Sequence, residues 1–224
     1  MIVLSTRGQH AERKVLIRES IAWRIPAKGY FLGILIPAAI LGLALAALVT
    51  VSAVPFHWYG NAFGFWIDDM IFGSLLRAYG EEMGWRGFLL PRLQARMNGL
   101  QASLLIGLIW WTWHLPVRLN PGHFQWMVNL IYLAEILSLS VILTWLRNST
   151  PGTLVPVIIL HAAINSGLDT IRMPDETWYQ LRWHLYLAGA ALLMAGFILT
   201  IAGKKLGEAH APENAGHISE SSRA

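Results

Sequence analysis

The stretch AYGEEMGWRGFLL, residues 78–90, holds two adjacent acids, Glu81 and Glu82, and then Arg86 among aromatic, aliphatic and glycine residues. An ionised side chain at the centre of a bilayer costs about 3 kcal/mol on insertion scales, so such residues normally face the interior of a helix bundle or a water-filled cavity. We therefore expect this stretch to form a membrane helix that carries a polar site.

The composition of the chain is that of an integral membrane protein. Of its 224 residues, 55% are hydrophobic and 13% are charged, whereas roughly a quarter are charged in soluble domains. The mean hydropathy is +0.47. The formal net charge of +4 is interpreted as basic residues in cytoplasmic loops, and no nucleic-acid partner is predicted. The chain has no cysteine, which excludes disulfides, thiolate metal sites and cysteine catalysis.

The apolar residues are grouped into segments long enough to cross a membrane, which takes about 20 residues of helix. These segments are residues 30–54, 63–97, 100–117, 124–146, 153–171 and 183–201. The sequence thus predicts an all-α fold, a polytopic transmembrane helical bundle of about six spans. We expect a basic cytoplasmic segment at residues 1–29, a transmembrane domain at residues 30–203 with its motifs between 70 and 170, and a disordered cytoplasmic tail at residues 204–224.

Lysine and arginine residues are distributed unevenly around these segments. Most of those near the ends of the predicted spans fall on the side of the N-terminus, including Arg92 and Arg96 after the second span and Lys204 and Lys205 after the sixth. Because cytoplasmic loops carry an excess of these residues, the sequence predicts that both termini lie in the cytoplasm. We expect a multi-pass protein of the cell membrane.

Polar residues in two further apolar segments belong with the acidic pair. The second and third predicted spans turn near residues 97–99, and Glu81 and His114 both lie roughly 23–25 Å from that turn at 1.5 Å per helical residue. His161 and Asn165 in the fifth span are four residues apart, so their side chains point the same way. We expect these groups to meet in one polar cavity.

A cavity with these groups has the chemistry for hydrolysis of a peptide bond. Water attack on an amide needs a base, a group that stabilises the oxyanion and a proton donor for the leaving amine. A glutamate and a histidine can activate the water directly, or Glu81, His114 and His161 can bind Zn²⁺ with an open position for water. Asn165 is then the expected oxyanion donor. The residue types leave both routes to water activation open.

The residues around Glu81 have expected supporting roles. Glu82 and Arg86 are four residues apart, which predicts an ion pair that orients the site and leaves Glu81 for chemistry. Gly80 and Gly84 are also four residues apart and predict a small-residue face for close helix contact.

Other functions compete with peptide hydrolysis. The sequence has no His-Glu-x-x-His zinc helix and no Gly-x-Ser-x-Gly nucleophile elbow, which argues against two other hydrolytic sites. The alternative function is a non-catalytic membrane immunity or peptide-binding protein that uses the same pocket. A proton-coupled transporter is a third hypothesis, because intramembrane Glu and His residues also form proton relays.

Three short motifs on separate apolar segments resemble those of a known family. They are Glu81-Glu82-x-x-x-Arg86, Trp110-x-x-x-His114 and His161-x-x-x-Asn165, in that order within residues 70–170. Their order and spacing are similar to those of the CPBP family, the CAAX proteases and bacteriocin-processing enzymes, also called the Abi or type II CAAX prenyl endopeptidase family. In that family the second motif usually begins with Phe, where this chain has Trp110.

The resemblance implies an all-helical intramembrane endopeptidase, a kind of hydrolase commonly described as a metalloprotease. It implies that Glu81 and His114 activate water or bind a metal such as Zn²⁺. It also implies that His161 and Asn165 complete the catalytic site. The implied partner is a peptide or protein substrate at the membrane, and the family includes roles in CAAX processing and in bacteriocin immunity.

Overall fold

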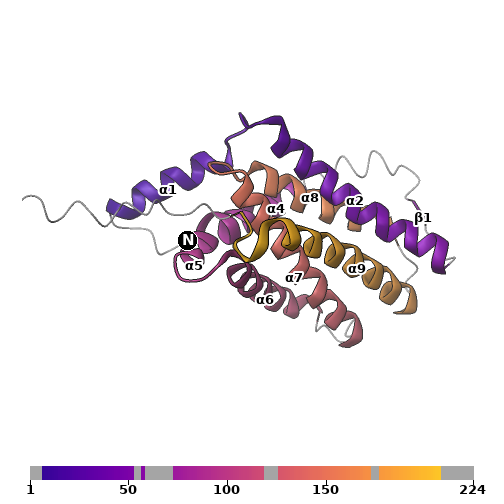
Figure 1. Cartoon of the computed structure of the whole chain (residues 1–224). Helices are drawn as coiled ribbons and strands as arrows, with labels where there is room; N and C mark the ends of the chain where they lie inside the picture. The colour runs from indigo at the N-terminus through magenta and orange to yellow at the C-terminus, as the bar shows by residue number, and fades with distance from the viewer. Residues whose placement is uncertain (1–6, 53–56, 59–72, 119–125, 173–176, 208–224) are drawn as a thin grey trace, which may run out of the picture.

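The computed structural model describes residues 7–52, 57–58, 73–118, 126–172 and 177–207 (Figure 1). Its α-helices are α1 (Arg7–Ser20), α2 (Ala27–Ser52), α4 (Leu75–Glu82), α5 (Leu90–Gln94), α6 (Gly99–Arg118), α7 (Trp126–Ser149), α8 (Val155–Thr170) and α9 (Thr177–Ala202). A π-helix, η2 (Met83–Leu89), joins α4 to α5, and a 3₁₀ turn, η3 (Gly203–Lys205), follows α9. Strand β1 (His57–Trp58) pairs antiparallel with β2 (Ile171–Arg172). The predicted all-α helical bundle is confirmed.

Among the described residues, three helical segments are long and apolar enough to cross a membrane, namely α2, α7 and residues Trp178–Lys205, which include most of α9. The apolar stretch Val155–Asp169 of α8 is shorter. The beginning of the predicted second span, residues 63–72, lies outside the described residues, as does most of the predicted tail, residues 208–224. The helices support an integral membrane protein, and the count of six spans stays a prediction.

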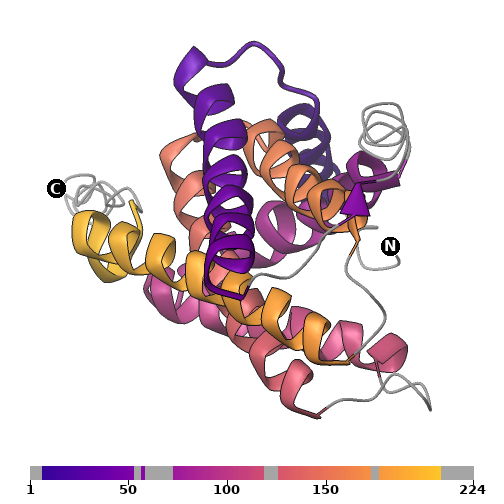
Figure 2. The ribbon, with the colours of Figure 1, turned by 90° about the vertical axis from the view of Figure 1, so that its right-hand side faces the viewer.

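The helices divide into an interior helix and outer helices. In α7, 67% of the apolar segment is buried, against 28% in α2 and 33% in α9. Figure 2 shows α2 and α9 packed against one another, with α7 behind α9. Large apolar side chains such as Phe31 and Leu193 are exposed on these outer helices. An apolar outer surface of this kind fits contact with lipid acyl chains.

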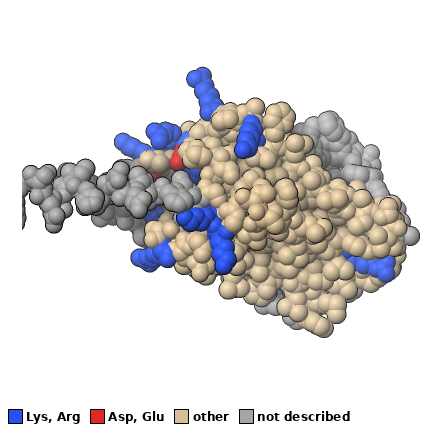
Figure 3. All heavy atoms as spheres, in the orientation of Figure 1, with Lys and Arg blue, Asp and Glu red and all other residues tan. Residues whose placement is uncertain are grey.

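The turns at the α1 end of the bundle are held together by hydrogen bonds. The Leu154 N–H, just before α8, donates to the Glu19 carbonyl of α1 at 2.9 Å. Asn148 Nδ2, near the end of α7, donates to the Leu206 carbonyl at 3.1 Å. Lysine and arginine side chains gather at this end (Figure 3). The arrangement agrees with the charge asymmetry used to predict cytoplasmic termini, and the orientation itself stays a prediction.

Helices α6 and α7 approach closely at Gly107. A Cβ at this position would lie 3.0 Å from Leu137 Cδ2 and 3.1 Å from Ser140 Cβ, so a larger residue would push the two helices apart. The close approach lets Ser140 Oγ donate a hydrogen bond to the Ser103 carbonyl of α6 at 2.7 Å. This bond fixes the position of Ser140 beside the polar centre of the bundle.

The helix contact expected at Gly80 and Gly84 was wrong. Both glycines are exposed, and no described atom beyond their own helix lies within 4 Å of where a Cβ would stand. The close contact of this segment is made at Gly87, where a Cβ would collide with Leu16 of α1. The sequence pattern thus identified a small-residue helix but assigned the contact to the wrong face.

Candidate active site

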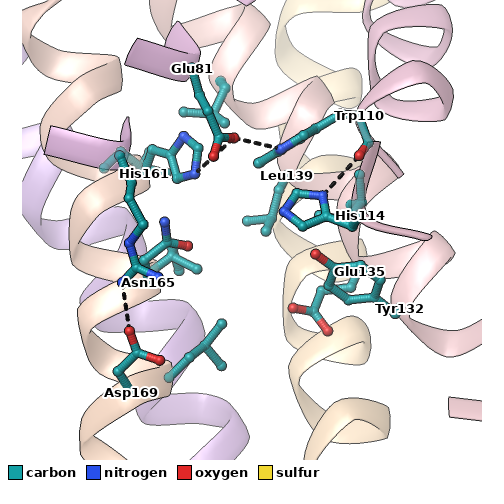
Figure 4. A pocket seen from close by; sticks show the side chains of 15 residues that line it. Glu81, Trp110, His114, Tyr132, Glu135, Leu139, His161, Asn165 and Asp169 are labelled. Carbon is teal, nitrogen blue, oxygen red and sulfur yellow. Dashed lines mark hydrogen bonds and ion pairs between the residues drawn. The ribbon is translucent and has the colours of Figure 1, made fainter. Parts of the chain in front are cut away.

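A cavity of about 170 Å³ opens in the middle of the bundle between α4, α6, α7 and α8. Its wall includes Glu81 of α4, His114 of α6, and His161 and Asn165 of α8 (Figure 4). The structure therefore brings four of the six site residues expected from the sequence to one cavity. The other two, Glu82 and Arg86, lie behind its wall.

Glu81 is the acid that faces the cavity, and its side chain is 25% exposed. Its Oε2 accepts a hydrogen bond of 2.8 Å from Nε1 of Trp110, a residue that is 3% exposed. The same oxygen lies 3.9 Å from Nε2 of His161, which is too long for a direct hydrogen bond. The indole therefore fixes one carboxylate oxygen and leaves space beside the imidazole.

Glu82 and Arg86 form a fully buried ion pair, as their spacing predicted. Nη1 of Arg86 donates to Glu82 Oε1 at 3.0 Å, and both side chains are completely buried. Nη2 of Arg86 donates to Ser140 Oγ at 3.1 Å, and Ser140 in turn bonds to the Ser103 carbonyl. We call Glu82, Arg86, Ser103 and Ser140 the buried network. Removing one charge from such a pair leaves the other uncompensated in low dielectric.

The buried network also orients His161. Nδ1 of this imidazole lies 2.7 Å from Glu82 Oε1, and the ring is 3% exposed. Because an ionised carboxylate only accepts hydrogen bonds, Nδ1 carries the proton. Nε2 is consequently the nitrogen that faces the cavity and Glu81.

His114 is oriented in the same way by a backbone group. Its Nδ1 lies 2.9 Å from the Trp110 carbonyl, which only accepts, so this nitrogen also carries a proton. The ring meets the edge of Tyr132 at a centroid distance of 5.8 Å and an angle of 84°. In the neutral ring Nε2 is left as an acceptor.

The helix around Glu82 departs from α geometry at the site. Residues Met83–Leu89 form the π-helix η2, and the Leu90 N–H donates to the Trp85 carbonyl five residues earlier. Such π segments are rare and occur frequently at functional sites. The wider turn follows the acidic pair directly, between Glu82 and the rest of the helix.

Asn165 and Asp169 continue the α8 face from His161 toward the mouth of the cavity. Asp169 Oδ2 accepts from Arg77 Nη2 at 2.7 Å, and the two side chains are 44% and 52% exposed. An ion pair with this exposure contributes little to stability.

Comparison with known proteins agrees with the motifs. A family model described as "Type II CAAX prenyl endopeptidase Rce1-like" matches residues 63–167. A protein named CAAX prenyl protease 2 from Methanococcus maripaludis is 28% identical over 170 residues. That match covers 72% of this chain and 63% of the relative, so the chain corresponds to less than two thirds of that protein. Both similarities agree with the resemblance of the three motifs to the CPBP family.

Two neighbours of the candidate site were missed from the sequence. Glu135 of α7 lines the cavity and is 1% exposed, and its Oε2 lies 3.0 Å from Nδ1 of His184 of α9. From the sequence, His184 is expected at the membrane interface because it lies near a predicted span end. A lone acid within the predicted fourth span was the signal for Glu135, since an intramembrane ionisable residue is a functional hypothesis by default.

The expected zinc ligands do not come together as a metal centre. Glu81, His114 and His161 do not form a three-donor group, and no three His, Asp or Glu side chains do so among the residues described. The hydrogen bonds on Nδ1 of both imidazoles suit a metal ligand as well as a catalytic base. The arrangement as it stands is not a Zn²⁺ site, the metal route stays a prediction, and the chemistry below is derived without it.

Proposed function

We propose that this chain is an intramembrane endopeptidase in which Glu81 activates a water molecule for attack on a peptide bond. The observation that supports the proposal best is the exposure of Glu81 to the cavity, next to two imidazoles whose Nδ1 atoms are already bonded. The name of the relative, CAAX prenyl protease 2, agrees with this reaction type.

Water activation uses two acceptors in the cavity wall. The Glu81 carboxylate and Nε2 of neutral His114 both accept hydrogen bonds, so one water can donate a hydrogen to each. The water oxygen then presents a lone pair to the substrate carbonyl carbon. As the new C–O bond forms, the proton passes from the water to Glu81, which acts as the general base.

Oxyanion stabilisation falls to the α8 side of the cavity. Asn165 offers two N–H donors in its carboxamide. His161 donates from Nε2 when its ring is protonated, because Nδ1 is occupied by Glu82. The protonated Glu81 then gives its proton to the leaving amine as the C–N bond breaks, which regenerates the carboxylate and balances the reaction.

The substrate is a peptide segment that reaches the cavity from the membrane. A volume of about 170 Å³ is close to that of an engineered cavity of about 150 Å³ that binds one benzene molecule. The cavity therefore has room for one side chain beside the scissile bond. We propose that the protein lies in the cell membrane with both termini in the cytoplasm, consistent with the side on which Lys and Arg gather.

The test is proteolysis by purified full-length protein in lipid nanodiscs. Internally quenched peptides, including CAAX tails with and without a prenyl group, are incubated with wild type, Glu81→Gln and Glu12→Gln. Glu12 lies on α1 and pairs with Arg92 outside the cavity, so its variant is the matched control. We expect cleavage by wild type and the control, and cleavage slower by about 10²- to 10⁴-fold in Glu81→Gln. Cleavage by Glu81→Gln at a rate close to that of the wild type would overturn the proposal.

The non-catalytic alternative gives a different result in the same experiment. A peptide-binding or immunity protein would bind peptides equally well before and after the Glu81→Gln change and would release no fragments. Mass spectrometry of the peptides after incubation separates the two outcomes.

A further inference from the structure

A second carboxylate lines the same cavity and has no part in the proposed reaction. Glu135 comes from the interior helix α7 and lies on the side of the cavity formed by His114 and Tyr132, whereas His161 and Asn165 lie on the α8 side (Figure 4). A buried acid with one hydrogen-bond partner is costly unless a further donor satisfies it. Its position in the wall of a cavity raises the question of what that donor is.

The hydrogen bonds of Glu135 leave one oxygen for a ligand. Oε2 is bonded to Nδ1 of His184 at 3.0 Å. Within the described parts of the chain, no other hydrogen bond or ion pair to this carboxylate is seen, and Oε1 is not enclosed by protein atoms. The second oxygen therefore has access to the cavity.

The ion pair of Glu82 and Arg86 shows what a buried structural carboxylate looks like in this protein. Glu82 is bonded through Oε1 to a guanidinium and an imidazole, its Oε2 is enclosed with no hydrogen-bond partner among the described residues, and it is separated from the cavity. Glu135 differs in both respects, since its partner is a single imidazole and it lines the cavity. A role limited to joining α7 to α9 accounts for the contact with His184 but not for the open oxygen.

The charges in the cavity wall favour a cationic occupant. The wall includes the acids Glu81, Glu135 and Asp169 and the base Arg77, and Arg77 is paired with Asp169 at the mouth. Glu81 and Glu135 are therefore the carboxylates of that wall without an arginine or lysine partner in it, and the nearby Arg118 lies over the ring of Tyr132 at 3.4 Å. An ammonium or guanidinium group at Oε1 of Glu135 would gain a charge-assisted hydrogen bond.

We infer that Glu135 forms an acidic subsite that binds a basic side chain of the peptide substrate close to the scissile bond. The inference rests on the proposed function and narrows it to substrates with Lys or Arg at one position beside the cut. A cavity with room for one side chain fits one such residue. Glu135 is then a specificity-determining residue rather than a catalytic one.

The experiment compares how efficiently the protein cleaves peptides that differ in one residue beside the cut. A peptide cleaved by the wild type is remade with Lys, Gln, Leu or Glu at each position flanking the cut, and kcat/KM is measured for wild type, Glu135→Gln and the control Glu12→Gln. We expect wild type and the control to prefer Lys over Gln at one position by about tenfold or more, the usual worth of a hydrogen bond to a charged group. Glu135→Gln should reduce this ratio to near one.

Two readouts keep the inference falsifiable. Thermal unfolding in detergent shows whether Glu135→Gln is folded. Fluorescence anisotropy measures binding of the Lys and Gln peptides without turnover, in the Glu81→Gln protein and in the Glu81→Gln/Glu135→Gln double variant. The ratio of these two affinities is compared with the ratio from kcat/KM. An unchanged ratio in Glu135→Gln, or no preference for Lys in wild type, overturns the subsite. Cleavage by Glu81→Gln at a rate close to that of the wild type overturns the proposed function instead, so the two failures are distinct.

Discussion

Glu81 and Glu82 are adjacent in the sequence, yet they belong to two regions with opposite properties. Glu82 is completely buried and bonded to Arg86 and His161. Glu81 is one quarter exposed, faces the cavity and is held through a single oxygen by Trp110. The contrast shows how one helical turn supplies both a buried, paired acid and an acid that faces the cavity. The buried network fixes the ring of His161, which lies beside Glu81.

The largest effect should come from the cavity acid. Glu81→Gln keeps the shape of the side chain but removes the base, so we expect kcat to fall by about 10²- to 10⁴-fold. The unfolding temperature should stay close to that of the wild type, because the carboxylate is not part of the buried network. Initial rates of peptide cleavage test the expected fall in kcat, and thermal unfolding tests the expected stability. A large loss of stability would contradict the division between the two acids.

A substitution in the buried network should lower the free energy of unfolding. Arg86→Met leaves Glu82 with His161 alone and should lower the free energy of unfolding by about 3–5 kcal/mol. The control is Arg92→Met, which breaks the exposed Glu12–Arg92 pair and should cost less than about 1 kcal/mol. Chemical unfolding in detergent micelles gives both values. Equal losses of unfolding free energy in the two variants would show that burial does not make the Glu82–Arg86 pair more important for stability than the exposed pair.

The bond that holds Glu81 can be removed while an aromatic ring is kept at the same position. Trp110→Phe deletes the indole N–H and keeps an aromatic ring, so we expect roughly a tenfold lower kcat, the worth of one hydrogen bond to a charged group. The matched control is Trp111→Phe, because Nε1 of Trp111 is buried with no hydrogen-bond partner seen among the described residues. A similar loss of kcat in both variants would show that ring size, and not the bond to Glu81, is responsible.

A smaller change is expected at the far end of the buried network. Ser140→Ala removes the hydroxyl that accepts from Arg86 and should lower the free energy of unfolding by about 1–3 kcal/mol. Ser138→Ala is the control, since Ser138 bonds only to the Ala134 carbonyl of its own helix. Unfolding curves for both variants measured in the same detergent give the difference. If Ser140→Ala lowers the free energy of unfolding no more than Ser138→Ala does, Ser140 is not part of the buried network.

Metal removal should have the smallest effect. Because Glu81, His114 and His161 do not form a three-donor group, we expect kcat/KM to be unchanged after treatment with a chelator and after addition of Zn²⁺. Metal content by mass spectrometry and cleavage rates before and after treatment test this. A rate that falls with the chelator and returns with Zn²⁺ would restore the metal route that the sequence left open.

The helices were predictable because long apolar segments leave few alternatives in a membrane. The predicted span at residues 153–171 corresponds to α8, Val155–Thr170. The last span was expected to begin at residue 183, but α9 begins at Thr177. Its first turns contain polar residues such as Gln180 and Arg182, which lower the local hydropathy without ending the helix. Hydropathy thus located the apolar part of the helix but not its beginning.

Contacts within one helix were easier to predict than contacts between helices. The spacing of Glu82 and Arg86 predicted their ion pair, since residues four apart in a helix are neighbours. The bond from His161 to Glu82 joins residues 79 apart in the chain and depends on how α8 is rotated against α4. Glu135 and His184 are 49 residues apart, and no local pattern connects them. Rotation of one helix against another is set by packing, which the sequence does not display directly.

The π-helix η2 has a consequence for how this motif tolerates insertions and deletions. A π segment holds one more residue than an α segment that turns the chain through the same angle, because its N–H groups bond five residues back rather than four. Deleting one residue from Met83–Leu89 would therefore let this segment return to α geometry while Glu81 and Glu82 keep nearly their present faces. The identity of the charged residues is thus under a stricter requirement than the length of the segment.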